Sequence, residues 1–264
     1  MLFSVCKFCG GKDVFCFPVG TKRRDFQYFR CRSCGGISLS EGCYLSVGEQ
    51  VERYQHHRNE LSDSGYARFL CDFVSSCFSF LRGRACSHIL DYGSGPSPAL
   101  VGLLRMVSAR QRESQQPRRT ACLPDPPSLA ACVDFLCHSL PRLPEQDCIT
   151  GWDPFFDCDV NLQEGRADLV LCLEVAEHFE RPLEGFAGLA HSCARGGHVA
   201  VGTLPIPDGM DIPQGFKGWW YKDDRTHVSF YTEGSMAACG GSCGLRYLGK
   251  ASPRIFMFQK PGDA

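Results

Sequence analysis

One stretch of ten residues restricts what this chain can fold into more than any other. Residues 89–98 (ILDYGSGPSP) follow a short apolar run that begins at Cys86, and an apolar-rich segment continues after them. This order is typical of a strand, a tight turn and a helix, the opening unit of an open α/β sheet. Gly93 and Gly95 permit backbone angles that other residues avoid, and they allow a ligand to approach the main chain. We therefore expect an α/β fold whose ligand lies beyond the carboxyl end of this strand.

Two residues of this stretch indicate which ligand it holds. A dinucleotide fingerprint has a third glycine where this chain has Pro98, so a nicotinamide enzyme is disfavoured. Asp91 would repel a pyrophosphate, whereas it can accept a hydrogen bond from an ammonium group. The stretch resembles the first motif, acid-x-Gly-x-Gly, of the class I S-adenosylmethionine-dependent methyltransferases. That resemblance implies that the amino-acid end of the methyl donor is held by Asp91, Gly93 and Gly95.

Length, charge and cysteine content limit the remaining function classes. The 264 residues can hold one large α/β domain and a small module. No apolar run reaches the roughly 18 residues of a membrane helix, and the N-terminus lacks the apolar core of a signal peptide. A formal net charge of −1 argues against a large polyanion-binding surface. We expect a cytoplasmic protein without membrane association, in which the 18 cysteines are reduced thiols and some are metal ligands.

The N-terminal segment 1–44 is predicted to be a zinc ribbon and a unit of its own. Two Cys-x-x-Cys pairs, each followed by glycine, supply four thiols: Cys6, Cys9, Cys31 and Cys34. This spacing is typical of a tetrahedral structural zinc site. So short a segment has too small a hydrophobic core to fold alone without a bound metal ion or another cross-link. The alternative is a set of buried free cysteines. Residues 22–24 (KRR) lie at the expected hairpin tip, where they could contact RNA or an acidic substrate. We favour the alternative, a solvated turn.

Residues 45–85 are interpreted as a helical lid or connector. The segment 54–66 (YQHHRNELSDSGY) is more polar and aromatic than a packing helix requires. It also resembles the segment before the first motif in some zinc-ribbon methyltransferases, which makes Tyr54 and His57 candidates for substrate contacts. The alternative is an amphipathic connector with a turn at Gly65.

Residues 108–147 interrupt the expected alternation of strands and helices. They hold several arginines among Ser and Gln and then a run of prolines, although the second strand normally follows within a few residues. We expect a loop-rich insertion within a catalytic domain that covers 86–264. Its arginines fit either a basic arm for RNA or a tolerated surface insertion, and we favour the surface insertion.

Asp153 ends the next predicted strand, which covers 148–152. In nucleoside-binding α/β sheets an acid at the end of the second strand accepts hydrogen bonds from the ribose hydroxyls. Asp134 is nearer along the chain, but its surroundings suggest a helix, so we assign the ribose role to Asp153. The segment 151–156 (GWDPFF) also resembles the matching segment of this methyltransferase group.

The most specific match is the run 168–179 (DLVLCLEVAEHF), a buried-strand pattern with a polar turn after it. It closely resembles the fourth motif of the ubiquinone-biosynthesis-like class I methyltransferases, the type 11 and 23 group. The resemblance implies that three residues line the methyl-donor pocket: Glu174, Val175 and Ala176. Glu177 and His178 either take part in catalysis or hold the turn.

The spacing of the later elements predicts the rest of the sheet. Only 14 residues lie between Asp153 and Asp168, so the usual third strand and its helix are shortened or missing, and the acid that often contacts the adenine amine has no equivalent. A helix, a glycine turn and a buried strand follow in the order of the family. Two further strands form an antiparallel C-terminal edge: 245–250 and 254–259. The expected α/β fold is Rossmann-like, mostly parallel, with helices on both faces.

The long segment 204–231 is the expected substrate side of the site. Loops of this length in compact domains are usually functional, and residues 219–231 (WWYKDDRTHVSFY) resemble the substrate-side loop of the same group. Three aromatic side chains suit a substrate cleft: Trp219, Trp220 and Tyr221. His227 is the first candidate for a general base, because a neutral imidazole can take up a proton near pH 7. The alternative is that His227 pins the loop through hydrogen bonds.

These observations predict methyl transfer from S-adenosylmethionine to an oxygen, nitrogen or carbon nucleophile, with zinc in a structural role. Such a displacement depends mainly on positioning the donor and the acceptor. The ribbon, with seven Lys and Arg against three Asp and Glu, fits an RNA base as acceptor, whereas the family resemblance implies a small metabolite, which we favour. The alternative from another class is a non-catalytic RNA- or protein-binding adaptor, which would not need Asp91 or Asp153.

Overall fold

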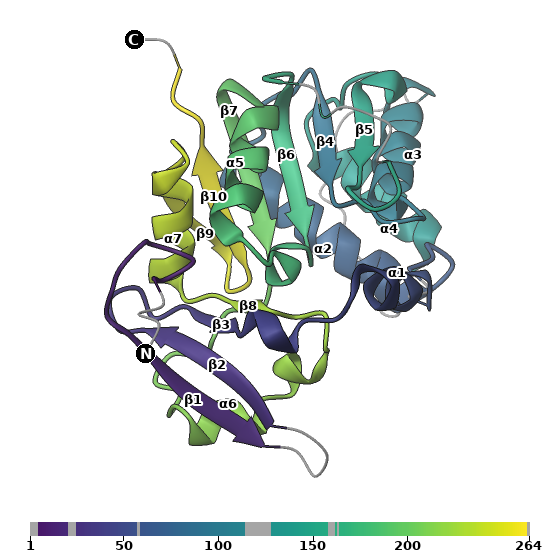
Figure 1. Cartoon of the computed structure of the whole chain (residues 1–264). Coiled ribbons are helices and arrows are strands. Elements are labelled where there is room, and N and C mark those ends of the chain that lie inside the picture. Colours follow the sequence, from purple (N-terminus) through teal and green to yellow (C-terminus); the bar gives the residue numbers. More distant parts are fainter. Residues whose placement is uncertain are drawn as a thin grey trace.

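The computed structural model contains two sheets, which divide the molecule into a larger and a smaller half (Figure 1). It describes residues 5–20, 25–56, 59–113, 128–157, 162 and 164–262. The larger sheet has six strands, in the spatial order β5 (Ile149–Trp152), β4 (Ile89–Tyr92), β6 (Ala167–Leu173), β7 (Cys193–Gly202), β10 (Ile255–Gln259) and β9 (Arg246–Ser252). The first four strands run parallel, and β10 pairs antiparallel with both β7 and β9.

Both faces of the larger sheet are buried, which is why its central strands are continuously apolar. Leu169 and Leu171 of β6 face one core, while Val170 and Cys172 face the other. The first face is covered by α2 (Ser64–Phe80), α3 (Ala99–Glu113) and α4 (Leu129–Ser139). The second face is covered by α5 (Pro182–Ser192) and α7 (Glu233–Ser242). The predicted Rossmann-like α/β architecture with an antiparallel C-terminal edge is confirmed.

The shortened third unit of the sheet is also confirmed. β5 is an edge strand, and the described residues between Trp152 and Ala167 contain neither a helix nor a strand. The next strand of this sheet along the chain is β6, which lies on the other side of β4.

The prediction of a loop-rich segment over 108–147 is wrong for its described parts. α3 continues to Glu113, and α4 packs on α2 and α3 with Cys132 and Leu136 fully buried. Of the polar residues that suggested a loop, Arg110 is exposed, whereas Ser108 is fully buried and Gln111 Nε2 donates to the carbonyl oxygen of Pro141 at 3.0 Å. The two helices thus form a hairpin on the sheet. Residues 114–127 lie outside the described residues.

The smaller sheet changes the interpretation of the N-terminal segment. Its strands are β1 (Val14–Gly20), β2 (Asp25–Cys31), β3 (Ile37–Leu39) and β8 (Ser229–Phe230), in that order and all antiparallel. The last strand comes from the predicted substrate loop: Ile37 pairs with Phe230, and Ser38 with Ser229. The expectation that 1–44 forms a unit of its own is therefore wrong, because its sheet is completed by a segment almost 200 residues later.

A shared aromatic core joins the same two segments. Phe17 and Tyr28 of the N-terminal strands pack against Phe216 of α6 (Gln214–Gly218), with Tyr28 and Phe216 ring centroids 5.0 Å apart. Trp219 is only 8% exposed in this core. The segment 204–231 is therefore a packed connection rather than a free loop.

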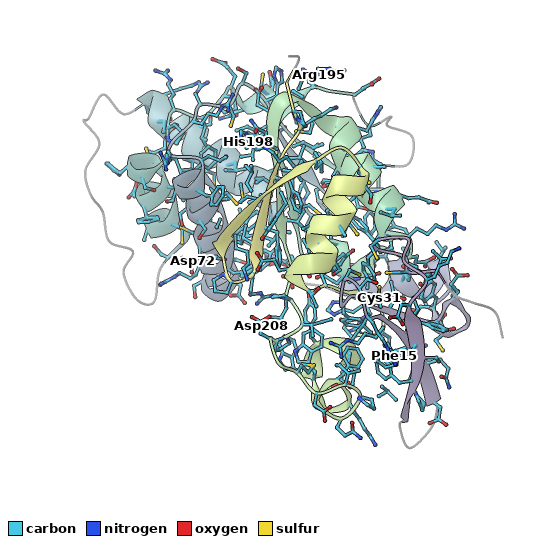
Figure 2. All side chains as sticks on the ribbon, turned by 90° about the vertical axis from the view of Figure 1, so that its left-hand side faces the viewer. Phe15, Cys31, Asp72, Arg195, His198 and Asp208 are labelled. Atoms are coloured by element: carbon cyan, nitrogen blue, oxygen red, sulfur yellow. The ribbon has the colours of Figure 1, made fainter. Side chains whose placement is uncertain are left out.

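The smaller half lies at the carboxyl ends of the parallel strands. In Figure 1 the arrowheads of β4 and β6 point toward β1, β2 and β3. Figure 2 shows Arg195 and His198, at the start of β7, at the end of the molecule away from Phe15 and Cys31. The helical character expected for 45–85 appears in α1 (Val47–His56) and α2. Within the described ranges, no helix has the length and apolar character needed to cross a bilayer.

Candidate active site

A cavity of about 1020 Å³ opens where the carboxyl ends of the parallel strands meet the smaller half. Its walls come from α1, α2, the turns after β4, β5 and β6, and a 3-10 turn over Trp220–Asp223. The structure brings most of the predicted site residues together around it: Tyr54, Asp91, Gly93, Gly95, Asp153, Glu174, Val175, Glu177, His178, Trp220, Tyr221 and His227. These residues lie far apart in the sequence, and the strand order of the sheet brings them together.

The turn after β4 has the geometry that its two glycines suggested. Gly93 has φ +83° and Gly95 has φ +66°, backbone angles that favour glycine. Gly93 also lies against Val175: a Cβ atom on Gly93 would be 2.5 Å from Cγ2 of Val175. Val175 therefore closes one side of the turn, and only glycine fits at position 93.

Asp91 is buried at the floor of the cavity beside a second acid. Its side chain is 6% exposed, and burial, together with the negative charge of Asp153, raises the pKa of Asp91 to about 7. A cation bound next to this carboxyl group would favour its ionised form. The floor of the cavity is thus suited to a positively charged group.

Asp153 is fixed by the main chain on both sides. Its Oδ2 accepts a hydrogen bond from the backbone N–H of Gly95 at 2.9 Å, and its Oδ1 accepts one from Phe155 N–H at 2.8 Å. The side chain of Asp153 therefore connects the end of β5 to the glycine turn after β4. Each carboxylate oxygen has a further lone pair for a ligand hydroxyl group.

Glu174 occupies an unusual backbone conformation where β6 ends. Its φ is +53°, in the left-handed region that non-glycine residues rarely adopt. Its Oε1 accepts from Nη2 of Arg254 at 2.9 Å. Burial and the nearby Glu177 raise the pKa of Glu174 to about 8, although Arg254 opposes the shift. No pattern around Arg254 in the sequence indicated this contact.

Glu177 is completely buried and accepts two short hydrogen bonds. The hydroxyl groups of Tyr221 and Thr203 each donate to its carboxylate at 2.7 Å. Burial and the charge of Glu177 raise the pKa of Tyr221 far above its usual range, so Tyr221 stays a hydrogen-bond donor. Thr203 was missed in the sequence, where it directly follows the last residue of a buried strand.

His178 and His227 lie against each other at the cavity wall, with ring centroids 4.9 Å apart. Nδ1 of His178 is 3.0 Å from the carbonyl oxygen of Thr226, and Nδ1 of His227 is 2.7 Å from that of Tyr221. Since a carbonyl oxygen only accepts, both Nδ1 atoms carry the proton and both Nε2 atoms keep a lone pair in the neutral form. Burial lowers the pKa of His178, which favours this neutral form.

An ion pair connects α1 to the segment that carries His227. The guanidinium of Arg53 binds both carboxylate oxygens of Asp224, at 2.8 and 2.6 Å. Although burial opposes the shift, this pairing and the hydrogen bonds from Thr226 lower the pKa of Asp224. Arg53 was not identified from the sequence, although Asp224 lies in the motif that resembles a substrate-side loop.

Three of the predicted substrate residues lie in different environments. Tyr54 lines the cavity with its ring 5.4 Å from that of His178, and Trp220 is 66% exposed at the cavity wall. Trp219 does not line the cavity, because its indole fills the aromatic core of the smaller half. Ala176 also lies outside the lining, where its carbonyl oxygen accepts from the hydroxyl of Tyr231. His57 and residues 22–24 lie outside the described residues.

Four cysteines gather at the base of the N-terminal strands. Cys6 Sγ is 3.6 Å from Cys34 Sγ, and Cys9 Sγ is 3.7 Å from Cys31 Sγ. In a tetrahedral zinc site with Zn–S bonds of about 2.3 Å, sulfur atoms lie about 3.8 Å apart. The hydrogen bond with Cys34 lowers the pKa of Cys6 to about 5. The four side chains fit one zinc ion, which would be held by thiolates at a distance from the cavity lining.

The fold and the site define a class of protein: an open α/β domain with a ligand cavity at the carboxyl ends of its parallel strands. Residues 54–248 match the family model described as a methyltransferase domain, and the chain belongs to this family. No curated protein sequence matched the chain.

The solved structures to which the chain is similar include methyltransferases. An O-methyltransferase family protein from Burkholderia thailandensis is 17% identical, with a TM-score of 0.47; the match covers 81% of this chain and 63% of that protein. Magnesium protoporphyrin IX methyltransferase from Synechocystis PCC 6803 with bound SAH is 15% identical, with a TM-score of 0.41 and coverage of 81% and 95%. This chain thus spans less than two thirds of the Burkholderia protein.

Proposed function

We propose that this protein transfers a methyl group from S-adenosylmethionine to a small molecule that binds in the same cavity. The observation that carries the proposal is the continuity of that cavity. The Asp91 and glycine turn and the paired imidazoles of His178 and His227 line one and the same cavity. A cavity of about 1020 Å³ lies at the upper end of the range for ligand pockets, about 300–1,000 Å³, which leaves room for a donor and an acceptor.

The donor is assigned to the strand-end part of the cavity. Asp91 would accept from the donor ammonium group, and the main chain of Gly93 and Gly95 would contact its amino-acid end. Asp153 would accept from the ribose hydroxyls, and Glu174 and Val175 would line the adenosine side. These roles rest on the resemblance to the family motifs, together with the burial of Asp91 and the restrained position of Asp153.

The charge of the cavity favours a neutral or cationic acceptor. Eight carboxyl groups line it among the described residues: Asp91, Asp153, Glu174, Glu177, Glu180, Glu184, Asp223 and Asp224. The two arginines of the described lining, Arg53 and Arg181, each pair with one of these acids, and two cations outside the lining, Arg254 and Lys222, pair with Glu174 and Asp223. A phosphate backbone would be repelled by such a surface, since nucleic-acid binding requires neutralisation by Lys and Arg. We therefore favour a small molecule over RNA.

The acceptor is assigned to the space between α1 and the 3-10 turn. Tyr54 and the exposed indole of Trp220 offer aromatic surface there. The Nε2 atoms of His178 and His227 offer lone pairs to a hydroxyl or amine group of the acceptor. An acceptor that carries a proton on its nucleophilic atom would donate it to one of these two nitrogen atoms.

The proposal is tested by calorimetric titration of the zinc-replete full chain with S-adenosylmethionine and S-adenosylhomocysteine. We expect micromolar binding by the wild type, and binding at least about tenfold weaker for Asp153→Ala, since a hydrogen bond to a charged group contributes about 1.5–3 kcal/mol. Asp134→Ala is the matched control, because Asp134 lies exposed on α4 and should leave binding unchanged. Folded wild-type protein that binds neither ligand would refute the proposal and favour a non-catalytic adaptor.

A further inference from the structure

Three potential metal ligands meet at the wall of the cavity. One nitrogen of His178, one nitrogen of His227 and a carboxylate oxygen of Glu177 all lie within 4.8 Å of one another. Two of the residues are adjacent in the turn after β6, and the third comes from the segment before β8. Sets of two imidazoles and one carboxylate bind zinc in hydrolases and non-haem iron in oxygenases.

The two imidazoles are oriented as metal ligands usually are. Metal-binding histidines commonly donate their second ring N–H to a backbone carbonyl or a carboxylate, which fixes the tautomer and the ring orientation. Here the carbonyl oxygens of Thr226 and Tyr221 accept from the two Nδ1 atoms. The remaining Nε2 atoms are the ones that a metal ion would bind. Two independent carbonyl contacts thus prepare the same tautomer in both rings.

The carboxylate is held in place by neutral donors. Both contacts of Glu177 come from hydroxyl groups, those of Tyr221 and Thr203, so its negative charge is not matched by a cationic side chain among these contacts. The nearby Arg254 binds Glu174 instead. A buried anion that is oriented by neutral hydrogen bonds gains from a cation placed beside it. A metal ion bound beside Glu177 would supply a positive charge that neither of these two contacts provides.

We propose that Glu177, His178 and His227 bind one divalent transition-metal ion of the Zn²⁺, Fe²⁺ or Co²⁺ class. Three protein ligands leave at least one coordination position open, as in catalytic zinc sites. Because these residues line the cavity, an oxygen or nitrogen atom of a bound molecule would occupy the open position. This site is distinct from the four-cysteine site in its residues and its ligand chemistry, and it does not depend on the proposed methyl transfer.

Metal binding and proton uptake use the same electron pair of His227. If Nε2 coordinates a metal ion, His227 does not act as a general base. A hydroxyl group bound to the ion would instead lose its proton more easily, because the cation stabilises the alkoxide or phenolate that remains. The presence of a bound ion therefore decides between two chemical roles for the same side chain.

Cobalt titration of the full chain loaded with a single equivalent of Zn²⁺, which the four thiolates take up, tests the proposal. Co²⁺ binds more weakly than Zn²⁺ to a given site, so it should not displace zinc from the four thiolates. We expect one equivalent of Co²⁺ to bind with visible ligand-field absorption and without the strong thiolate-to-cobalt charge-transfer band of a cysteine site. Titration followed at this absorption gives the affinity without any activity assay.

Two variants and a matched control assign the ligands. His227→Gln and Glu177→Gln should each weaken Co²⁺ binding by about 10- to 100-fold or more, since even a residue that only orients a ligand changes affinity by that factor. His191→Gln, on the exposed side of α5, should bind Co²⁺ as the wild type does. The proposal is overturned if the folded wild type binds no Co²⁺ outside the cysteine site, or if folded His227→Gln binds it with unchanged affinity.

Discussion

Replacing Asp91 with asparagine should strengthen the ligand-free fold and weaken donor binding at the same time. Burial, with a contribution from Asp153, raises the pKa of Asp91 to about 7, whereas the carboxyl group ionises near 3.8 when it is unperturbed. Between these pH values the folded chain holds a proton that the unfolded chain has lost, so stability falls as pH rises. Above pH 7 the accumulated loss is on the order of 4 kcal/mol. Asp91→Asn removes this loss and should raise the thermal midpoint at pH 8.

The same substitution removes the proposed partner of the donor ammonium group. A hydrogen bond to a charged group contributes about 1.5–3 kcal/mol, which corresponds to about 10- to 150-fold in affinity. In the wild type the carboxyl group has to ionise to accept from the ammonium, so affinity should rise up to about tenfold per pH unit below pH 7 and level off above it. Asp91→Asn should bind weakly with no such dependence between pH 6 and 8.

Calorimetric titration with S-adenosylhomocysteine at pH 6, 7 and 8, paired with thermal unfolding, measures both effects on the same samples. Asp134→Asn is the control, since its side chain is 52% exposed and it should change neither affinity nor stability. The reasoning fails if Asp91→Asn binds the donor product as the wild type does, or if it is less stable than the wild type at pH 8.

Two further pairs of substitutions test the glycine turn and the cysteine site. Gly93→Ala should destabilise the ligand-free fold more than Gly95→Ala, because its Cβ would collide with Val175, whereas a Cβ on Gly95 meets no protein atom within 4 Å and adds only the left-handed backbone strain of about 1–2 kcal/mol. Thermal unfolding of the two ligand-free variants compares them, and equal losses of stability would contradict the role of Val175. Cys31→Ser should lose zinc and speed amide exchange at Phe230, which pairs with Ile37, while exposed Cys16→Ser should change neither zinc content nor exchange. Unchanged exchange at Phe230 in the zinc-free variant would show that the two segments are not coupled.

The strand-end part of the cavity, to which we assign the donor, could be predicted from the sequence because its residues lie at strand ends. Strand order places Asp91 and Asp153 at one edge, and the contact between Asp153 and Gly95 follows from that order. Residues in such motifs can be placed in space once the order of the strands in the sheet is predicted correctly. The roles of these residues toward a donor stay predictions until a ligand is measured.

The acceptor side was less predictable, because it depends on contacts without local patterns. β8 is two residues long and becomes a strand only through its pairing with β3. Trp219 and Trp220 are neighbours in the sequence, and both were expected in the substrate cleft. The indole of Trp219 packs instead into the aromatic core of the smaller half, because Phe17 and Tyr28 supply an apolar surface for it. The helical surroundings expected for Asp134 are confirmed by α4, but the segment around this helix was expected to be loop-rich, because prolines lie on both sides of it, and its packing on α2 and α3 was not predicted.

The pairing of β3 with β8 has a consequence for the order in which the chain can fold during synthesis. The first strands leave the ribosome early, and proteins generally fold from the N-terminal side as they emerge. Their sheet, however, receives its last strand only after residue 230 has been made, and the aromatic core also needs Phe216. Until then, four thiolates and a zinc ion would be the main restraint on the nascent ribbon. Zinc supply during translation would then affect the yield of native protein, even if the finished molecule retains its ion tightly.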